Sequence, residues 1–267
     1  MKDKVVVITG ASSGIGEALA VEAAKQGAMV VMGARNVEKL QVLAEQIRTK
    51  GGQVTFVEMD VTQEEDCKRL IESAVTAFGR IDVLINNAGI SMRALFEELD
   101  LSVLKKLMDT NFWGTVYCTK YAFPYILQSK GSIVGVSSIA GFKGLPGRTG
   151  YSASKFAMHG FLESLRTENL KKGIHVMIAC PGFTASNIRN TALVADGTQQ
   201  GETPRDEDKM MSASAVAIHI LKAIDKRKRT LVLTLQGKTT VLASKIIPGI
   251  AEKLVFNHMS KEPNSPF

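Results

Sequence analysis

A tyrosine and a lysine four positions apart, Tyr151 and Lys155, form the pattern in this 267-residue chain that best suits proton transfer. They fall at the start of a segment with helical spacing, so both side chains should lie on one face and reach a common site. A free tyrosine has a pKa of about 10, and a nearby ammonium should lower that pKa toward values useful at neutral pH. A tyrosine and a lysine at this spacing usually form an amphipathic surface pair, so the catalytic interpretation depends on further residues.

Ser138 supplies the first of these further residues. It stands thirteen positions before Tyr151, at the end of a short apolar run, and its presence favours a catalytic function for the pair. Ser137 is the neighbour with which it could be confused. Successive residues of a strand point to opposite faces, so only one of the two serines can face a substrate. Asn111, in a long predicted helix, is a further candidate that could equally be a buried structural residue.

A glycine-rich turn follows the first apolar run, at residues 5–8, and precedes a helical pattern. Residues without Cβ let the backbone approach a pyrophosphate, and a helix N-terminus offers free N–H groups and partial positive charge. We expect Gly10 and Gly14 to serve that approach and Gly16 to allow close packing of the helix. The turn also contains Ser12, Ser13 and Ile15. A glycine triplet alone is weak support for a nucleotide site, because such turns are common.

The elements that must position these residues alternate between short β-branched runs and longer helical patterns. The runs lie at residues 5–8, 29–32, 54–58, 83–85, 133–136, 174–179 and 231–233. The first six are apolar enough to be buried on both faces of a sheet, which is typical of parallel strands. The sequence therefore predicts an α/β fold, a three-layer doubly wound parallel sheet, in a single domain over residues 1–267.

Two segments stand outside this alternation. Residues 185–211 lack clear periodicity and follow a strand's carboxyl end, where open α/β sheets bind ligands, so we expect a lid, with a disordered segment as the alternative. Residues 238–257 form an apolar tail with roughly helical spacing that Pro248 and Gly249 should interrupt. This tail could cover the pocket, join subunits or lie peripherally on a membrane; we favour core or subunit packing.

Composition narrows the class of protein. The net charge is +7, but the basic residues are scattered, and the one basic run, at 226–229, would complement the dipole at a helix C-terminus, so we do not expect nucleic-acid binding. The N-terminal apolar run is too short for a secretory signal, and no stretch has the length of a membrane span. Cys67, Cys118 and Cys180 are widely spaced and suggest neither a disulfide framework nor a metal site. These features favour a soluble protein of the cytoplasm.

Taken in order, the motifs resemble those of the short-chain dehydrogenase/reductase family, in its compact branch. Besides the turn and the pair, the resemblance rests on residues 86–89 (Asn-Asn-Ala-Gly), on Ser137 and Ser138, and on Pro181 and Gly182. Any one motif could arise by chance, but the ordered set, from residue 5 to about residue 235, is highly specific. It implies a Rossmann-type core, a nicotinamide cofactor, and a catalytic set of Asn111, Ser138, Tyr151 and Lys155.

The resemblance also implies the role of each residue. Tyr151 would exchange a proton with the substrate oxygen, Lys155 would also hold the nicotinamide ribose, and Ser138 rather than Ser137 would donate a hydrogen bond to that oxygen. Asn111 would position a water. Further cofactor contacts are implied at Asp60, Val61, Asn87, Ala88, Gly89, Pro181, Gly182, Thr184 and Ser186. Asp60 could instead cap the helix that follows it.

The end of the second strand bears on the choice of cofactor. NAD-using Rossmann proteins commonly carry an acidic residue there, which binds the ribose hydroxyls. Here Ala34 takes that position and is followed by Arg35 and Asn36, and arginine's planar fork suits a phosphate. We therefore expect NADP(H) rather than NAD(H). Against this, Arg35 could be an exposed loop residue, and Ser13 stands where many NADP-using relatives have a second basic residue.

The expected activity is that of an NADP(H)-dependent oxidoreductase that interconverts a secondary alcohol and a ketone or aldehyde. Candidate pocket walls are mostly apolar and favour a hydrophobic substrate: Met92, Arg93, Phe142, Leu145, Phe183, Ile188 and Leu193. Arg93 could meet a carboxylate or an acyl-carrier phosphate, or face solvent. The alternatives are a 3-oxoacyl-(acyl-carrier) reductase and a non-catalytic NADPH-binding sensor or scaffold. By resemblance, the helices carrying Asn111 and Tyr151 would join subunits in a homodimer or homotetramer.

Overall fold

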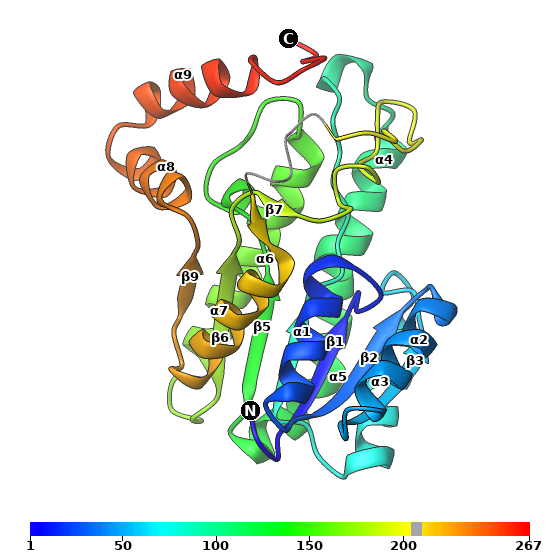
Figure 1. Cartoon of the computed structure of the whole chain (residues 1–267). Helices are drawn as coiled ribbons and strands as arrows, with labels where there is room; N and C mark the ends of the chain where they lie inside the picture. Colours follow the sequence, from blue (N-terminus) through cyan, green and yellow to red (C-terminus); the bar gives the residue numbers. More distant parts are fainter. Residues whose placement is uncertain (204–209) are drawn as a thin grey trace.

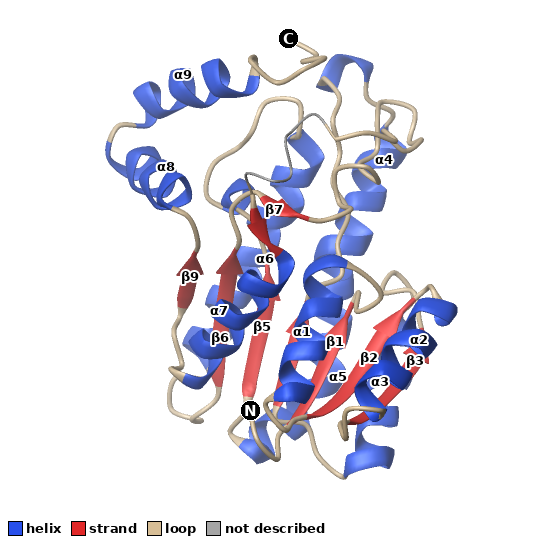
Figure 2. Cartoon of the chain, in the orientation of Figure 1, coloured by secondary structure: helices blue, strands red, loops and turns tan. Residues whose placement is uncertain are grey.

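The computed structural model of the chain describes residues 1–203 and 210–267. Within them one parallel sheet of seven strands lies between two layers of helices, and the α/β prediction is confirmed (Figures 1 and 2). The strand order is β3-β2-β1-β4-β5-β6-β9, so the sheet reverses its direction of growth between β1 and β4. The strands are β1 (Val5–Thr9), β2 (Met29–Ala34), β3 (Gln53–Glu58), β4 (Val83–Asn86), β5 (Ser132–Val136), β6 (His175–Cys180) and β9 (Thr230–Val232).

The helices cover the two faces of the sheet in two groups. The first group packs in one hydrophobic core and consists of α1 (Gly14–Lys25), α2 (Val37–Arg48) and α7 (Ala213–Asp225). The second packs in the other core and consists of α3 (Glu64–Phe78), α5 (Gly114–Ser129) and α6 (Thr149–Glu168). The alternation of side chains along a strand explains this division, since Val6 and Ile8 enter the first core while Val5 and Val7 enter the second.

A third, smaller hydrophobic cluster lies beyond the carboxyl ends of the strands. Its buried members are Met92, Ala94, Leu99, Val103, Leu107, Ala140, Tyr151 and Leu193. The short helices α4 (Leu101–Leu107) and η3 (Ile139–Gly141) contribute to it, and η1 (Phe96–Glu98) and η2 (Met108–Trp113) lie nearby in the chain. This cluster matters for function because it fixes the ring of Tyr151 on the edge of the sheet where ligands bind.

The segment expected to act as a lid begins and ends at neighbouring positions. Its two ends pair in parallel as β7 (Thr184–Ala185) and β8 (Met211–Ser212). Its middle part is tied to the loop after β4, where the backbone N–H of Arg93 donates to the carbonyl of Leu193 at 2.8 Å. Residues 204–209 of the segment lie outside the described residues. That the segment acts as a lid stays a prediction.

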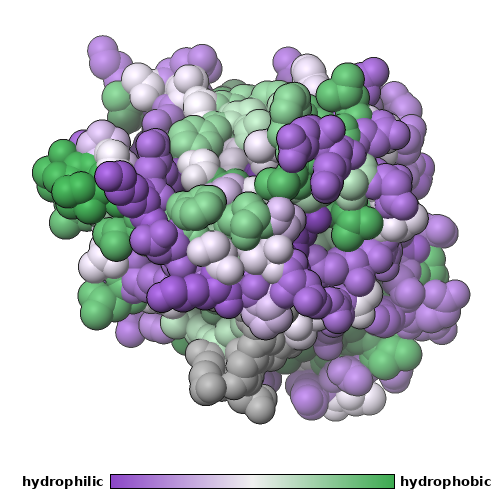
Figure 3. Space-filling view, turned by 90° about the horizontal axis from the view of Figure 1, so that it is seen from above, coloured by the Kyte–Doolittle hydropathy of each residue, from purple (hydrophilic) through white to green (hydrophobic). Residues whose placement is uncertain are grey.

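The C-terminal tail forms two helices, α8 (Leu235–Ile246) and α9 (Pro248–Met259). The predicted interruption is confirmed, and Pro248 begins α9, a position that proline favours. Both helices lie above the carboxyl edge of the sheet (Figure 1), and from above that side of the molecule is a mosaic of hydrophobic and hydrophilic residues (Figure 3). Among the described residues, no helix is long and apolar enough to span a membrane.

Candidate active site

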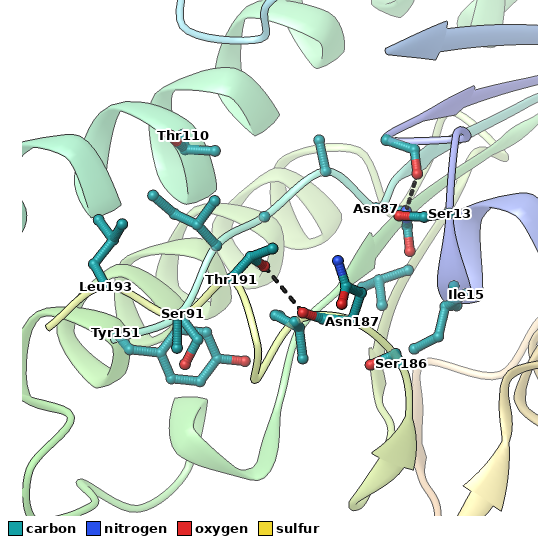
Figure 4. Close-up of a pocket in the computed structure, with 18 of the residues that line it drawn as sticks. Ser13, Ile15, Asn87, Ser91, Thr110, Tyr151, Ser186, Asn187, Thr191 and Leu193 are labelled. Atoms are coloured by element: carbon teal, nitrogen blue, oxygen red, sulfur yellow. Dashed lines mark hydrogen bonds between the residues drawn. The ribbon is translucent and has the colours of Figure 1, made fainter. Parts of the chain in front are cut away.

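A cleft of about 960 Å³ opens at the carboxyl edge of the sheet. Figure 4 shows Tyr151, Ser91 and Leu193 on one side of it, Ser13, Ile15 and Asn87 on the other, and Asn187 between them. Of the expected catalytic residues, Ser138, Tyr151 and Lys155 line the cleft and Asn111 does not. Every expected cofactor residue lines it except Gly16, and every expected pocket residue except Phe142. The topology thus brings together residues that the sequence spreads over most of the chain.

The loops after β1 and β4 form the floor of the cleft because the strand order reverses there. The Thr9 hydroxyl accepts hydrogen bonds from the backbone N–H groups of Asn87 and Ala88, each at 3.0 Å. A Cβ on Gly10 would lie 2.8 Å from the Cα of Ala88, and one on Gly16 would lie 2.2 Å from the Gly10 carbonyl oxygen. Gly16 therefore allows close helix packing, as expected, whereas Gly10 is needed chiefly for contact between the two loops.

Gly14 is the glycine whose surroundings suit the approach of a phosphate. It has a φ of +57°, at the N-terminus of α1, and a Cβ there would meet only the Cβ of Ser186, at 3.3 Å. The hydroxyl of its neighbour Ser13 does not cap the helix. Free backbone N–H groups at such a helix end attract anions. The residues present in the turn therefore fit the pyrophosphate of a dinucleotide.

Ser138, Tyr151 and Lys155 meet where β5 and α6 approach each other. Lys155 is buried, its Nζ lies 5.8 Å from the ring centroid of Tyr151, and it donates a hydrogen bond to the Val136 carbonyl at 3.1 Å. A hydrogen bond with Ser138 lowers the pKa of Tyr151. The Ser138 hydroxyl also accepts from the backbone N–H of Ala140 at 3.2 Å, which holds it at the end of β5.

The pKa of Tyr151 corrects one expectation. Burial raises this pKa, and the opposing effects of Ser138 and of the Arg148 charge do not cancel the rise, so the net shift is upward from the ordinary value. Lys155 does not reverse this rise; burial lowers the pKa of its own ammonium to about 8, so that Lys155 is still mostly protonated at neutral pH. At neutral pH the phenol is therefore protonated, the form that can donate a proton.

Asn111 lies in a π-helical turn, η2, and is fully buried. Its Oδ1 accepts from the backbone N–H of Ile90 at 2.8 Å, and its Nδ2 donates to the Ile90 carbonyl at 3.0 Å and to the Ser154 hydroxyl at 2.9 Å. The side chain thus ties the loop after β4 to α6, in agreement with the structural alternative. Its role in positioning a water stays a prediction.

A buried histidine next to the site, His159, was not predicted from the sequence. His159 follows Lys155 by four positions on α6, and a 2.7 Å hydrogen bond joins its Nε2 to the Ser137 hydroxyl. The Cys180 Sγ lies 3.7 Å from the same nitrogen. Burial, helped by the charge of Lys155, lowers the pKa of His159 to about 4. Ser137 is therefore engaged by His159, while Ser138 lies beside Tyr151; the helical spacing from Lys155 was the signal that could have found this histidine.

At the other end of the cleft, Arg35 has an exposed side chain and its guanidinium lies 3.9 Å from the Asp60 carboxylate. Asp60 also accepts hydrogen bonds from the backbone N–H and the hydroxyl of Thr62, both at 2.9 Å. Asn36 caps α2 by accepting from the backbone N–H of Lys39 at 2.8 Å. Asp60 and Asn36 thus have local structural partners, yet both still line the cleft.

Arg189, also missed, holds the start of the lid segment. The buried guanidinium donates to the carbonyl of Thr184 at 3.0 Å, and its Nε donates to the Thr203 hydroxyl at 3.0 Å. In Figure 4 the Thr191 hydroxyl reaches the carbonyl of Asn187, at 3.1 Å. These bonds order the backbone beside Ser186 and Ile188, which face the cleft.

A cleft at the point where a doubly wound sheet reverses, with a buried tyrosine and lysine beside it, is typical of a Rossmann-type oxidoreductase. The family model for short chain dehydrogenase matches residues 4–195. This chain belongs to that family and is an enzyme that acts on CH–OH groups.

Comparison with curated proteins gives relatives along nearly the whole chain. An "11-beta-hydroxysteroid dehydrogenase 1A" of Arabidopsis thaliana is 37% identical over 93% of this chain and 73% of its own length. One of Arachis hypogaea is 40% identical over the same shares. A "Dehydrogenase/reductase SDR family protein 7-like" of Dictyostelium discoideum is 35% identical over 97% of this chain and 83% of its own length.

Solved structures support the fold. A short-chain dehydrogenase/reductase of Burkholderia phymatum, in complex with NAD, has a TM-score of 0.83 and 23% identity, covering 99% of this chain and 98% of its own. An alcohol dehydrogenase of Thermococcus sibiricus, complexed with 5-hydroxy-NADP, has a TM-score of 0.74 and 23% identity, covering 86% and 94%. Neighbours with this fold thus bind nicotinamide cofactors of both kinds.

Proposed function

We propose that this chain is an NADP(H)-dependent oxidoreductase that interconverts a secondary alcohol and a ketone or aldehyde on a hydrophobic substrate. The observation that carries the proposal is the convergence of Ser138, Tyr151 and Lys155 at one end of a cleft whose other end is a glycine turn at a helix N-terminus. A bound nicotinamide supplies or accepts the hydride. These side chains must transfer the proton and orient the substrate oxygen.

In the reducing direction Tyr151 donates its phenolic proton to the carbonyl oxygen. The raised pKa of Tyr151 supports this direction, because it keeps the phenol protonated at neutral pH. The Ser138 hydroxyl, hydrogen-bonded to the phenol, donates to the same substrate oxygen. The charge of Arg148 opposes the effect of burial on the Tyr151 pKa and therefore stabilises the phenolate left behind, and the nearby Lys155 ammonium adds to that stabilisation.

The preference for NADP(H) rests on the residues at the end of β2. Ala34 leaves no carboxylate there to repel a 2′-phosphate, and the exposed Arg35 borders the cleft. Its ion pair with Asp60, at 3.9 Å, is long and exposed, and such pairs contribute little stability. Arg35 can therefore turn to a phosphate at small cost.

The class of substrate is proposed from two observations that agree. The cleft wall near Tyr151 is largely apolar, with Met92, Leu145 and Leu193 in the third hydrophobic cluster or against it. The curated relatives include proteins named as 11-beta-hydroxysteroid dehydrogenases. Steroid and other lipid ketones are therefore the first compounds to test. A 3-oxoacyl thioester in the same panel tests the acyl-carrier alternative.

The decisive experiment replaces Tyr151 by Phe, which removes the proton and keeps the ring in its cluster. Turnover of a ketone found with the unaltered enzyme and NADPH should fall by at least about 10³-fold, since proton transfer and the positioning of the oxygen are both lost. NADPH binding, followed by fluorescence titration, should stay within about threefold of the parent. Turnover near that of the parent enzyme would remove Tyr151 from the chemistry.

The same ketone panel separates the enzyme from a sensor. Oxidation of NADPH by at least one ketone supports catalysis, whereas tight NADPH binding without oxidation by any compound supports the sensor.

The cofactor preference is tested by Arg35→Ser. The change should raise the KM for NADPH roughly 10- to 100-fold, equivalent to about 1.5–3 kcal/mol for hydrogen bonds to a charged group, and leave the KM for NADH nearly unchanged. Arg69→Ser is the matched control, because Arg69 is also half-exposed in an ion pair, on α3, and does not line the cleft. Equal effects on both cofactors would contradict the preference.

A further inference from the structure

Two arginines that line the substrate end of the cleft meet at one carboxylate. Arg93, after β4, and Arg148, just before α6, have side chains that are 8% and 11% exposed, and both approach Oε2 of Glu262, at 3.7 and 3.5 Å. The Glu262 side chain is 5% exposed. Among the described residues, two arginines and one glutamate thus form a buried cluster, and its charge also acts on the site, since Arg148 lowers the pKa of Tyr151 against the larger effect of burial.

Glu262 reaches the arginines from the far end of the chain. It follows α9, and its backbone N–H donates to the carbonyl of Met259, which is itself buried. Arg93 also donates to the carbonyl of Pro263, at 2.6 Å. A Cβ on Gly147 would lie 3.3 Å from the ring of Phe267, so the last residues pack beside Arg148. Segments 170 and 114 positions apart in the chain thus meet behind one wall of the pocket.

The chemistry of the cluster makes Glu262 more than a structural contact. An arginine held beside an apolar pocket would attract an anionic group, because guanidinium–carboxylate pairs are strong and directional. Glu262 supplies such a carboxylate from within the chain. It does not line the cleft itself, so the guanidinium groups are engaged at the outer side of the pocket wall. The carboxylate of Glu262 therefore reduces the positive potential that Arg93 and Arg148 produce inside the pocket.

We propose that Glu262 determines specificity: by engaging Arg93 and Arg148 it keeps the substrate end of the cleft selective for uncharged carbonyl compounds and against anionic ones. The proposal rests on the proposed function and names the charge class of its substrate. It also assigns the C-terminal tail a function, since the tail carries the carboxylate to the pocket. Loss of that carboxylate removes a negative charge behind the pocket wall and makes the wall more attractive to a substrate carboxylate.

The test uses the full chain with NADPH and two ketones of one carbon skeleton, one bearing a side-chain carboxylate and one its methyl ester. In Glu262→Gln, the ratio of kcat/KM for the acid to that for the ester should rise at least about tenfold, because a negative charge beside Arg93 and Arg148 is removed. Glu252→Gln is the matched control. Glu252 is an exposed residue of α9 that pairs with Lys143 at 2.8 Å, so the change in charge on the tail is the same, and the ratio should stay that of the parent.

A double variant tests whether Arg93 causes the increase in the acid-to-ester ratio. Adding Arg93→Gln to Glu262→Gln should return the acid-to-ester ratio of kcat/KM most of the way to the parent value. The double variant removes one positive and one negative charge, so it also serves if the single variant fails to fold. A ratio that is unchanged in Glu262→Gln, or that already favours the acid in the parent, overturns the proposal.

A binding measurement keeps this test separate from the proposed function. The hydrophobic acid and its methyl ester are titrated as inhibitors or ligands against the NADPH complexes of the parent and Glu262→Gln, with affinity followed by calorimetry. Tighter binding of the acid, and not of the ester, to the variant supports the role of Glu262 even if no ketone is turned over. Equal affinities for the acid overturn it, whatever the activity.

Discussion

Burial is the dominant influence on the ionisable side chains around Tyr151. It raises the pKa of Tyr151 and lowers those of Lys155 and His159. All three shifts favour the uncharged form, as expected where water is excluded. At neutral pH Tyr151 and His159 are therefore uncharged, whereas Lys155, with a pKa of about 8, is still mostly protonated. A phenolate formed at Tyr151 would be stabilised by Lys155, by Arg148 or by a bound cofactor.

His159 gives a pH-dependent prediction. Its pKa is about 4 in the folded chain, against an ordinary value of 6.5 for an exposed histidine, so the unfolded chain binds the proton more readily between these values. The stabilisation is fully present above pH 6.5 and is lost as the pH falls toward 4, by up to about 3 kcal/mol. His159→Gln should flatten the dependence of the unfolding free energy on pH between about 4 and 7, measured by urea denaturation.

The exposed His219 supplies the control for this measurement. His219→Gln should keep the slope of the parent protein. The same slope in His159→Gln as in the parent would show that His159 is not the neutral, buried group described above.

Among the elements, the turn between β1 and α1 is the most tightly built. Its glycines let three backbone segments meet where a single Cβ would overlap main-chain atoms. The loop after β4 is held against it by Thr9 and Asn87, whose Nδ2 donates to the Thr9 carbonyl at 3.0 Å. The surface expected to bind the phosphates is therefore already ordered by the fold itself.

Gly16→Ala tests this account. The added Cβ would lie 2.2 Å from the Gly10 carbonyl oxygen and 2.5 Å from Asn87 Nδ2, so backbone must move. We expect a loss of stability of about 1–3 kcal/mol and weaker NADPH binding, measured by thermal denaturation and by fluorescence titration.

Gly249→Ala, in α9, is the matched control for Gly16→Ala. Its Cβ would meet nothing within 4 Å, so the change should keep the stability within about 1 kcal/mol of the parent and leave cofactor binding unaltered. A Gly16→Ala protein as stable as the parent would refute the packing argument.

For the whole molecule, the outer faces of α5 and α6 stand out as the expected subunit interface. Trp113 and Phe156 are 44% and 46% exposed, although both are large and apolar. Trp113 stacks on Tyr117 with ring centroids 5.7 Å apart, and Phe112 meets Phe161 edge to face. Aromatic groups of this kind are enriched in protein interfaces.

Phe156→Glu should therefore convert a homodimer or homotetramer into smaller species, because a carboxylate would be buried at the contact without a partner. Light scattering coupled to size-exclusion chromatography measures the mass. Val42→Glu, at a similarly exposed apolar position on α2, is the control and should keep the parent mass. A Phe156→Glu protein with the parent mass would place the interface elsewhere.

The sequence by itself determined the sheet, the order of motifs and most of the cleft. Alternating apolar runs encode buried parallel strands, and the positions of Gly10, Ser138, Tyr151 and Lys155 at strand ends and at a helix start follow from local spacing. Such features depend on near neighbours in the chain. A parallel sheet then brings the strand ends to one edge whatever the details of packing.

Only the tertiary structure decided the rest. Three features cannot be predicted from neighbouring residues in the chain. They are the pairing of Glu262 with Arg93 and Arg148, the hydrogen bond of His159 with Ser137, and the upward shift of the Tyr151 pKa. Each depends on distant segments that exclude water from a charged or polar group, and desolvation is a property of the assembled core. The tyrosine could therefore be found from the sequence, but its protonation and the charged cluster behind the pocket wall could not.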